Sequence, residues 1–263
     1  ELAILVRNYQ KDFQSFLATG FGEKSGAPQN ETGIYIGLKH QIDSRFTASA
    51  YFDQFRFQFS GTEVSEQTGG YDLLGMLEVK YNRNLNAYVL IRNEVKDTEF
   101  SQIADDGREY LQLGEKGRSS VRFQVEYQPN KLARLRSRVE LARYKPVTGT
   151  KEYGMLLYQD MRVNPVKKLQ IDGRISFFDT DSFDARVYQF ENDLLYVLSN
   201  TALSGQGQRW YAVVKYEPFE YLQLGIKYSR TVYENVQALS SGLNQISGNT
   251  RSFIGVQLRL YIK

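Results

Sequence analysis

Charged and apolar residues alternate with a period of two along most of the chain. The segment LARLRSRVELARYKP (132–146) shows this most clearly, with polar positions at Arg134, Arg136, Arg138 and Glu140 and apolar residues at most positions between them. A helix would spread these charges around its axis and leave no coherent apolar face. A strand places the charges on one face and the apolar side chains on the other. The segment is therefore predicted to be a two-faced strand.

The same alternation recurs in other parts of the chain, at 71–81, 85–95, 120–127, 168–178 and 251–263. The charged positions of these segments include Arg92, Glu94, Arg122, Glu126, Asp172 and Arg174. Alternation sustained over so many segments is typical of strands. We expect thirteen strands, at about 2–20, 31–40, 45–59, 71–81, 85–97, 118–128, 132–145, 152–163, 168–179, 184–198, 206–217, 219–233 and 249–263.

The connections between the expected strands are of two kinds. Tight turns rich in Asn, Pro and Asp are expected at 41–45, 82–84, 128–131, 164–168 and 217–220, and long polar loops at 21–30, 60–70, 98–117 and 234–249. In the first half of the chain the two kinds alternate strictly. Outer-membrane barrels have short periplasmic turns and long external loops, whereas a soluble sandwich has no reason to keep one edge short. The sequence therefore predicts an all-β fold, a transmembrane antiparallel up-and-down β-barrel, with residues 1–263 as one domain.

The strand count leaves one segment open. Single-chain bacterial barrels have even numbers of strands, and thirteen is odd. The tight turns at 164–168 and 217–220 fix the strand directions on either side of residues 181–205, so this segment must hold an even number of crossings. Either ARVYQFENDLLYVLSN (185–200) contains two short crossings, or part of it folds into the lumen. The preferred total is about fourteen strands.

The two phases of the strands have different expected surroundings. Leu135, Val139, Ile171 and Val256 belong to the apolar phase and are expected to face lipid. An arginine turned toward lipid would cost roughly 2–4 kcal/mol near the midplane, so the charged phase is expected to line a lumen. The predicted lumen-lining residues are Arg134, Arg136, Arg138, Glu140, Arg122, Glu126, Arg92, Glu94, Asp172 and Arg174. Ion pairs between strands should hold this wall and leave the lumen nearly balanced in charge, with a local excess of positive charge along the arginine row.

Composition agrees with strands and narrows the class of protein. The chain has 263 residues with 19 Tyr, 16 Phe and 5 Pro, and Tyr and Phe favour strands. Several rings fall near expected strand ends, which suits the aromatic girdles of membrane barrels; the alternative is that they are there only as good strand formers. The net charge of +3 is too small to indicate a nucleic-acid partner. No apolar run approaches the roughly 20 residues that a membrane helix needs.

Two further features of the sequence limit the interpretation. Cysteine is absent, which excludes a disulfide framework and a thiolate metal site. The chain begins at ELAILV without the basic and apolar regions of a secretory signal, so we expect a mature form or a fragment of a longer chain.

No group of residues indicates an enzyme, a cofactor or a metal site. His40 is the only histidine, and its place on the apolar phase beside a tight turn favours an interfacial ring over a catalytic base. Five acidic residues between 179 and 193 could hold Ca²⁺, but the EF-hand spacing is absent. A solvated loop is the preferred interpretation of these five carboxylates.

Five stretches spread over most of the chain resemble one known family. They are NETGIYIGL (30–38), AYFDQFRF (50–57), ISFFDTDSFDARVYQFENDLLY (175–196), GQGQRWY (205–211) and VQLRLYIK (256–263). They are similar to the C-terminal barrel region of the large helix-hairpin-helix (ComEA-related) outer-membrane proteins of Bacteroidetes-type bacteria. This resemblance implies an outer-membrane barrel whose physiological role is poorly defined. The helix-hairpin-helix part is missing here, so a nucleic-acid role tied to it is not carried over.

Three functional classes stay open on the sequence alone. The chain could be a pore or transport barrel for small polar solutes, a plugged structural or docking barrel within a larger envelope assembly, or a soluble all-β binding protein. The first class is preferred, with the bacterial outer membrane as its location and outer-membrane lipid as its surroundings. Other envelope proteins are candidate partners, while no nucleic acid and no cofactor are expected.

Overall fold

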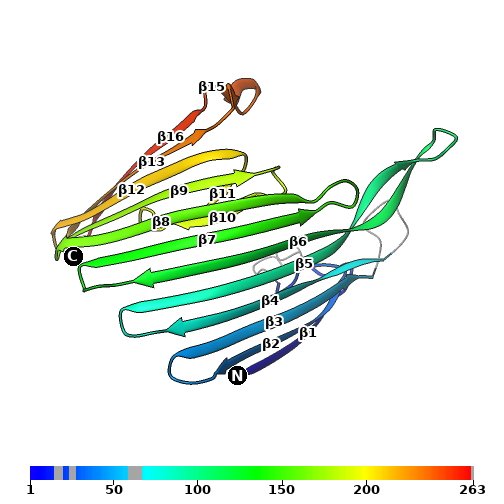
Figure 1. Cartoon of the computed structure of the whole chain (residues 1–263), viewed down its shortest axis with the longest axis horizontal. Helices are drawn as coiled ribbons and strands as arrows, with labels where there is room; N and C mark the ends of the chain where they lie inside the picture. The colour runs from blue at the N-terminus through cyan, green and yellow to red at the C-terminus, as the bar shows by residue number, and fades with distance from the viewer. Residues whose placement is uncertain (15–19, 24–27, 59–66, 262–263) are drawn as a thin grey trace. The chain divides into compact units, whose positions relative to one another are not determined.

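The structure is a computed structural model that describes residues 1–14, 20–23, 28–58 and 67–261. These residues form an all-β protein (Figure 1). The long strands are β1 (Leu2–Tyr9), β2 (Glu31–Gln41), β3 (Phe46–Phe57), β4 (Thr68–Lys80), β5 (Leu85–Ile103), β6 (Glu109–Tyr127), β7 (Ala133–Lys145), β8 (Glu152–Val166), β9 (Leu169–Thr180), β12 (Gln206–Phe219), β13 (Leu222–Tyr233) and β16 (Thr250–Leu260). The shorter elements are β10 (Val187–Glu191), β11 (Ser199–Leu203), β14 (Ala238–Leu239), η1 (Gly242–Asn244) and β15 (Ile246–Ser247). No helix in the described part of the chain has the length and apolar character to cross a membrane.

The long strands of the described residues form one sheet, in the order β1-β2-β3-β4-β5-β6-β7-β8-β9-β12-β13-β16. Each strand lies beside the next long strand along the chain. The pairs β1–β2, β2–β3, β8–β9, β9–β12, β12–β13 and β13–β16 are antiparallel. The prediction of an all-β, antiparallel, up-and-down arrangement is confirmed, and β1 and β16 are the two ends of this order.

The expected total of about fourteen strands is wrong for the described residues, because residues 181–205 add no strand to the main sheet. β9 pairs directly with β12, from Asp179 opposite Gln206 to Leu169 opposite Tyr216. Between them, β10 and β11 pair with each other as a separate hairpin. Each has five residues, fewer than the roughly 9–11 that a transmembrane strand needs. Of the two alternatives, the one with two short crossings is therefore wrong, and the segment folds back over one face of the sheet.

Two compact units make up the chain. Unit 1 comprises Glu1–Glu78, Val89–Val121 and Arg143–Lys151, and unit 2 comprises Val79–Tyr88, Arg122–Ala142 and Glu152–Lys263. Parts of five expected elements lie outside the described residues, namely 15–19 of the strand 2–20, 24–27 of the loop 21–30, 59 of the strand 45–59, 60–66 of the loop 60–70, and 262–263 of the last strand.

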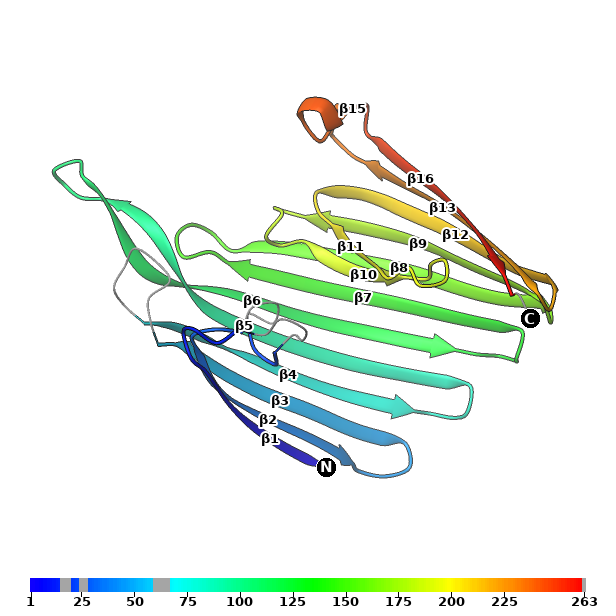
Figure 2. The same ribbon diagram turned by 180° about the vertical axis from the view of Figure 1, so that it is seen from behind.

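In unit 1, β5 and β6 form a hairpin that continues beyond the end of β4 (Figure 2). Its turn is Ala104–Arg108, where Ala104 N–H donates to the Arg108 carbonyl at 2.8 Å and Gly107 has φ +80°. The expectation of a long loop at 98–117 is therefore wrong, since most of that range is strand. Two polar strands satisfy each other's backbone groups without an apolar face, so their polar composition resembled that of a loop.

In unit 2, the two faces of the sheet have the reverse of the polarity of a soluble protein. On β9, Asp172, Arg174 and Ser176 are buried, whereas Ile175 and Phe177 are 41% and 46% exposed. Soluble domains bury their apolar side chains and expose their charges. Since successive strand residues point to opposite faces, one face of unit 2 is apolar and open and the other is charged and covered.

The residues that we expected to face lipid lie on the apolar face. Leu135, Val139 and Val256 are exposed, Val256 by 72%, and Ile171 is half-buried. Their neighbours in sequence belong to the charged phase and point to the opposite face of the sheet. The pattern of exposure therefore follows the predicted phases of the strands.

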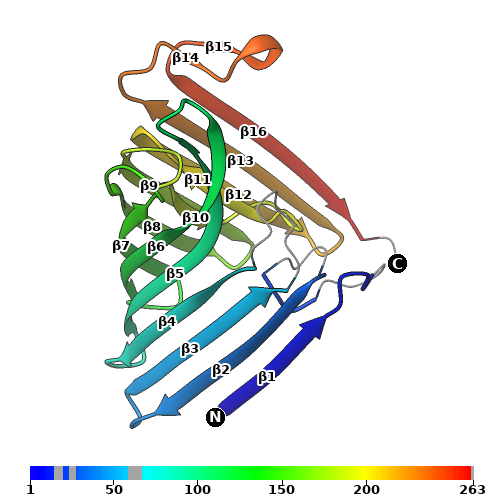
Figure 3. The ribbon, with the colours of Figure 1, turned by 90° about the vertical axis from the view of Figure 1, so that its right-hand side faces the viewer.

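The β10–β11 hairpin covers the charged face of unit 2 beside β8, β9 and β12 (Figures 1 and 3). Val187 and Leu203 of the hairpin pack with Leu156 of β8 and Phe178 of β9, and all four are buried. The hairpin therefore supplies this face with a small apolar cluster of its own. At the end of β13 and β16, the expected loop 234–249 holds β14, η1 and β15 (Figure 3).

Candidate functional site

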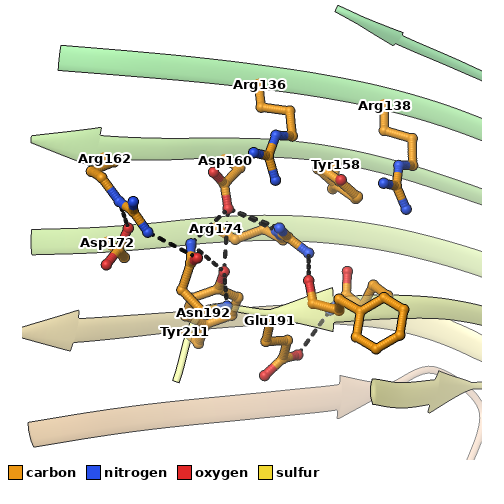
Figure 4. Close-up of polar contacts among 12 residues, drawn as sticks. Arg136, Arg138, Tyr158, Asp160, Arg162, Asp172, Arg174, Glu191, Asn192 and Tyr211 are labelled. Atoms are coloured by element: carbon orange, nitrogen blue, oxygen red, sulfur yellow. Dashed lines mark hydrogen bonds and ion pairs between the residues drawn. The ribbon is translucent and has the colours of Figure 1, made fainter. Parts of the chain in front are cut away.

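The charged face of unit 2, here called the polar wall, is the candidate functional surface (Figure 4). Period-two alternation gives it every second residue of β7, β8, β9, β12 and β13 and of the end of β6. It comprises Arg122, Gln124, Glu126, Arg134, Arg136, Arg138, Glu140, Tyr158, Asp160, Arg162, Asp172, Arg174, Arg209, Tyr211 and Lys227.

The arginine row of β7 is bound to neighbouring strands in three different ways. Arg136 pairs with Glu126 of β6, with Nη2 2.8 Å from the carboxylate. Arg138 donates from Nε and Nη2 to the amide oxygen of Gln124, at 3.0 and 2.7 Å. Arg134 has the weakest contact, since its Nη2 lies 3.8 Å from Asp160 Oδ1. The row is therefore only partly neutralised.

Glu140 is the other acidic residue predicted to stand beside this row. It accepts hydrogen bonds from Arg122 of β6, with Nε 2.8 Å and Nη2 3.1 Å from its two oxygens. The fork-to-fork geometry is the stronger kind of charge-assisted contact. Glu140 thus neutralises Arg122 of β6. Glu126 is therefore the carboxylate that is hydrogen-bonded to the arginine row.

Asp160 of β8 lies at the centre of the polar wall and is fully buried. Its Oδ2 accepts hydrogen bonds from Arg174 Nη2 at 2.8 Å, from Arg174 Nε at 3.1 Å and from the Tyr211 hydroxyl at 3.2 Å. Its Oδ1 and Arg134 Nε are buried without a hydrogen-bond partner among the described residues. Through Oδ2, Asp160 therefore links β8 to β9 and β12, while its Oδ1 faces Arg134 of β7.

A second ion pair extends the wall toward the tight-turn ends of β8 and β9. Arg162 Nε lies 2.5 Å from Asp172 Oδ1, and Asp172 is fully buried. Arg162 also donates from Nη2 to the side chain of Asn192 at 3.1 Å. Asn192 follows β10, so this pair links the wall to the hairpin.

Cations and aromatic rings alternate across five neighbouring strands at this level of the sheet. Arg138 lies 4.9 Å and Arg174 3.9 Å from the ring centroid of Tyr158, and Arg174 and Lys227 lie 5.5 and 5.2 Å from that of Tyr211. Cation–π contacts of this length are attractive and strengthen as water is excluded. These ring contacts add to the ion pairs that hold Arg174 and Lys227 in position.

The hairpin contributes two carboxylates to the wall, Glu191 and Asp193. Glu191 receives Arg209 Nε at 2.6 Å, Arg209 Nη2 at 2.9 Å and Lys227 Nζ at 3.0 Å, and Lys227 also lies 2.5 Å from Asp193. Burial raises the pKa of Glu191, but the hydrogen bonds and charges of Arg209 and Lys227 outweigh it and lower this pKa to about 2. Glu191 is therefore ionised at neutral pH.

The predicted acidic loop is thus divided by the structure. Asp181 and Asp184 are exposed in the loop after β9, as expected, whereas Asp179 is exposed but lies within β9. For Glu191 and Asp193 the expectation is wrong, because both are buried in ion pairs with the wall. No group of three or more candidate metal-binding side chains occurs within the described ranges. His40 is exposed at the end of β2.

Unit 1 has its own charged clusters, which include the two remaining predicted residues. Arg92 binds Asp72 through Nε at 2.9 Å and Nη2 at 2.8 Å, and Glu94 lies 2.8 Å from Lys96. A cluster that the sequence analysis missed is more deeply buried. Arg7 of β1 contacts Glu31 of β2 and Asp53 of β3, each at 2.6 Å.

Sequence reasoning also missed the part that the hairpin plays at the wall. Asp160 and Arg162 were not missed, because the alternation in YQDMR (158–162) assigns both to the polar phase as ion-pair partners of the neighbouring strands. Glu191, Asp193 and their partners had no comparable signal, because the hairpin is too short to show a period and its docking depends on residues far away in sequence.

Comparisons with known proteins give distant structural likenesses. No family model and no curated protein matches the chain. The Pseudomonas putida toluene transporter TodX aligns with 98% of this chain and 75% of its own, at 11% identity and a TM-score of 0.39. The β domain of the Bordetella autotransporter BrkA aligns with 88% of this chain and 90% of its own, at 12% identity and a TM-score of 0.36. Likenesses this weak carry no weight for function, which is argued below from the chain's own residues.

Proposed function

We propose that the chain is the wall of a bacterial outer-membrane β-barrel, non-enzymatic, whose polar wall lines a lumen for the passage of small polar solutes. The observation that carries this proposal is the reversed polarity of the strands. Ile175 and Phe177 are exposed, whereas Arg174 beside Ile175 and Ser176 between the two are buried. An open apolar face of this extent is stable against lipid and unfavourable against water, which disfavours the soluble binding protein.

Two further features support a membrane location. The connections at one end of the long strands are all short. At the other end, the described parts of the connections are mostly longer. In unit 2, exposed rings gather at the short end, at Tyr127, Tyr216, Phe219, Tyr221 and Tyr261. Amphipathic rings at one level of a sheet match the aromatic girdle at a membrane–water interface.

The charges of the polar wall indicate what a lumen would favour. As defined above, the wall has eight basic and four acidic side chains, and the hairpin adds Glu191 and Asp193. Most of these charges are paired, so strong selectivity is not expected. The excess of positive charge lies at Arg134, whose ion pair with Asp160 is long at 3.8 Å, and at Arg138, which binds the Gln124 amide, and it should favour anions slightly over cations.

A second candidate function is supported by the docked hairpin. A hairpin held by buried ion pairs over the polar wall is what a plugged structural or docking barrel would contain. In that case the chain would act by holding other envelope proteins, and solute passage would be absent.

Planar-bilayer conductance separates these functions. The protein is folded in a non-ionic detergent, its heat-modifiable migration on a denaturing gel is verified, and it is added to a bilayer. Steady single-channel steps with weak anion preference are the expected result. A heat-modifiable protein that inserts without conductance would favour the plugged barrel, and a monomer that stays soluble without detergent would overturn both.

A further inference from the structure

The hairpin and the polar wall meet at a contact that has the form of an anion-binding site. The carboxylate of Glu191 lies between the guanidinium of Arg209, which donates two hydrogen bonds, and the ammonium of Lys227, which donates one. A planar fork and a point charge converging on the same pair of oxygens is an arrangement that binds a carboxylate or a phosphate of any origin. Here the anion is part of the chain.

The wall itself does not neutralise these two cations. Its own buried carboxylates are engaged elsewhere, Asp160 with Arg174 and Asp172 with Arg162. Among the described residues, Arg209 and Lys227 form ion pairs only with Glu191 and Asp193, which both belong to the hairpin. If the hairpin left the wall, the buried Lys227 and the half-buried Arg209 would lose their partners together, and that is unfavourable unless another anion replaces them.

We propose that Arg209 and Lys227 form an anion-binding site for small solutes that carry a carboxylate or phosphate group, and that the hairpin segment 181–205 occupies this site as an internal competitor. The inference deepens the proposed function and rests on it, since a lumen must give the solute access. The segment has the charge that a competitor needs, with four acidic residues and one arginine. Displacement would convert a paired wall into a basic one.

The hairpin docks in one defined position, which makes the competition specific. Leu194 enters a gap between Gly225 of β13 and Gly255 of β16, where an added Cβ would lie 2.9 and 3.2 Å from the leucine side chain. Gln257 of β16 forms two hydrogen bonds with the backbone of Leu195, at 2.8 and 3.0 Å. Both contacts place the Glu191 carboxylate at the same point on the wall.

The covalent connection sets how strong an external competitor must be. The hairpin is tethered at both ends, to β9 and β12, so its effective concentration at the site is of the order of millimolar or higher. A free anion can therefore displace the hairpin carboxylates only at millimolar concentrations. At lower concentrations it can bind only when the hairpin's own charges have been removed. The second condition can be created by substitution.

The first test measures phosphate binding to the folded protein in non-ionic detergent without lipid. Glu191→Gln together with Asp193→Asn should raise the affinity for inorganic phosphate at least tenfold over the unsubstituted chain. Adding Arg209→Gln to this double variant should remove the gain. The matched control is Asp184→Asn, which removes an exposed charge from the same segment and should change nothing. A heat-modifiable double variant that binds phosphate no better than the unsubstituted chain would overturn the proposal.

The second test leaves the ion pairs unchanged and covers the case in which the double variant does not fold. Ser176 is buried and donates to Gln189 of the hairpin at 2.7 Å, and the chain has no cysteine. The thiol introduced by Ser176→Cys should react slowly with a water-soluble reagent and at least threefold faster in millimolar phosphate at constant ionic strength. Equal rates in phosphate and chloride would contradict displacement.

Two added arms identify the source of the anion and separate the two proposals. Anionic phospholipid micelles should not accelerate labelling, because the site lies on the face opposite the apolar side chains; acceleration by lipid alone would refute a site for small solutes. Both tests are independent of conductance. Phosphate binding without conductance would defeat the proposed passage of solutes alone, and conductance without phosphate binding would defeat this inference alone.

Discussion

The central ion pair of the polar wall should be among the most sensitive positions in the chain. Asp160 is fully buried and holds Arg174, whose side chain is also buried, through two hydrogen bonds at 2.8 and 3.1 Å. Asp160→Asn preserves the shape and one acceptor oxygen but removes the charge. Breaking one partner of a buried pair costs roughly 3–5 kcal/mol, and because an acceptor is retained we expect about 3 kcal/mol.

Urea unfolding in detergent micelles measures this loss, with fluorescence of the single tryptophan, Trp210, as the signal. The matched control is Asp106→Asn at the tip of the β5–β6 hairpin, where the ion pair with Arg108 is exposed. Exposed pairs contribute at most about 1 kcal/mol, so this control should be close to neutral. If Asp160→Asn lost no more stability than Asp106→Asn, the polar wall would not be held by buried ion pairs.

Three further predictions test the lipid face, the hairpin and the arginine row. Val139→Arg should destabilise the protein by roughly 2–4 kcal/mol in the same urea assay if the position is near the midplane, and a neutral effect would mean that the strand phase is reversed. Glu191 has a folded-state pKa of about 2 against 4.5 for the free side chain, so its contribution is fully present above pH 4.5 and is lost as the pH falls toward 2. The stability difference between the unsubstituted chain and Glu191→Gln should accordingly shrink from about 3 kcal/mol at pH 6 to near zero at pH 2, and a pH-independent difference would refute the ion-pair contact. Arg136→Glu should shift the reversal potential of an open pore toward cations, whereas in a plugged barrel it should change stability alone.

The sequence predicted the strands and their two faces because both follow from local rules. The alternation in 132–146 and 168–178 is enough to separate Leu135 from Arg136 and Ile175 from Arg174, since a strand has no other way to sort its side chains. The prediction of a long loop at 98–117 was wrong for a related reason. Its two polar strands pair with each other and require no apolar phase, so the signal that marks the other strands is absent there.

The candidate site was only partly predictable. Arg136 and Glu126 lie ten positions apart in one hairpin, so their pairing follows from the turn between β6 and β7. Glu191 and Lys227 are separated by 36 positions and meet because a short hairpin folds back over the sheet. No local pattern encodes that docking; it depends on complementary charge and on the gap at Gly225, which appear only in three dimensions.

The measurement that tests the reversed polarity most directly is a cysteine scan along β7, from 134 to 139, in the chain that has no native cysteine. Each single-cysteine variant is folded into lipid and treated with a lipid-phase and a water-soluble thiol reagent. We expect the lipid-phase reagent to label Leu135→Cys and Val139→Cys and to spare Arg134→Cys, Arg136→Cys and Arg138→Cys. Labelling of Arg136→Cys from the lipid phase, or equal labelling of all positions from water, would contradict a lumen lined by the polar wall.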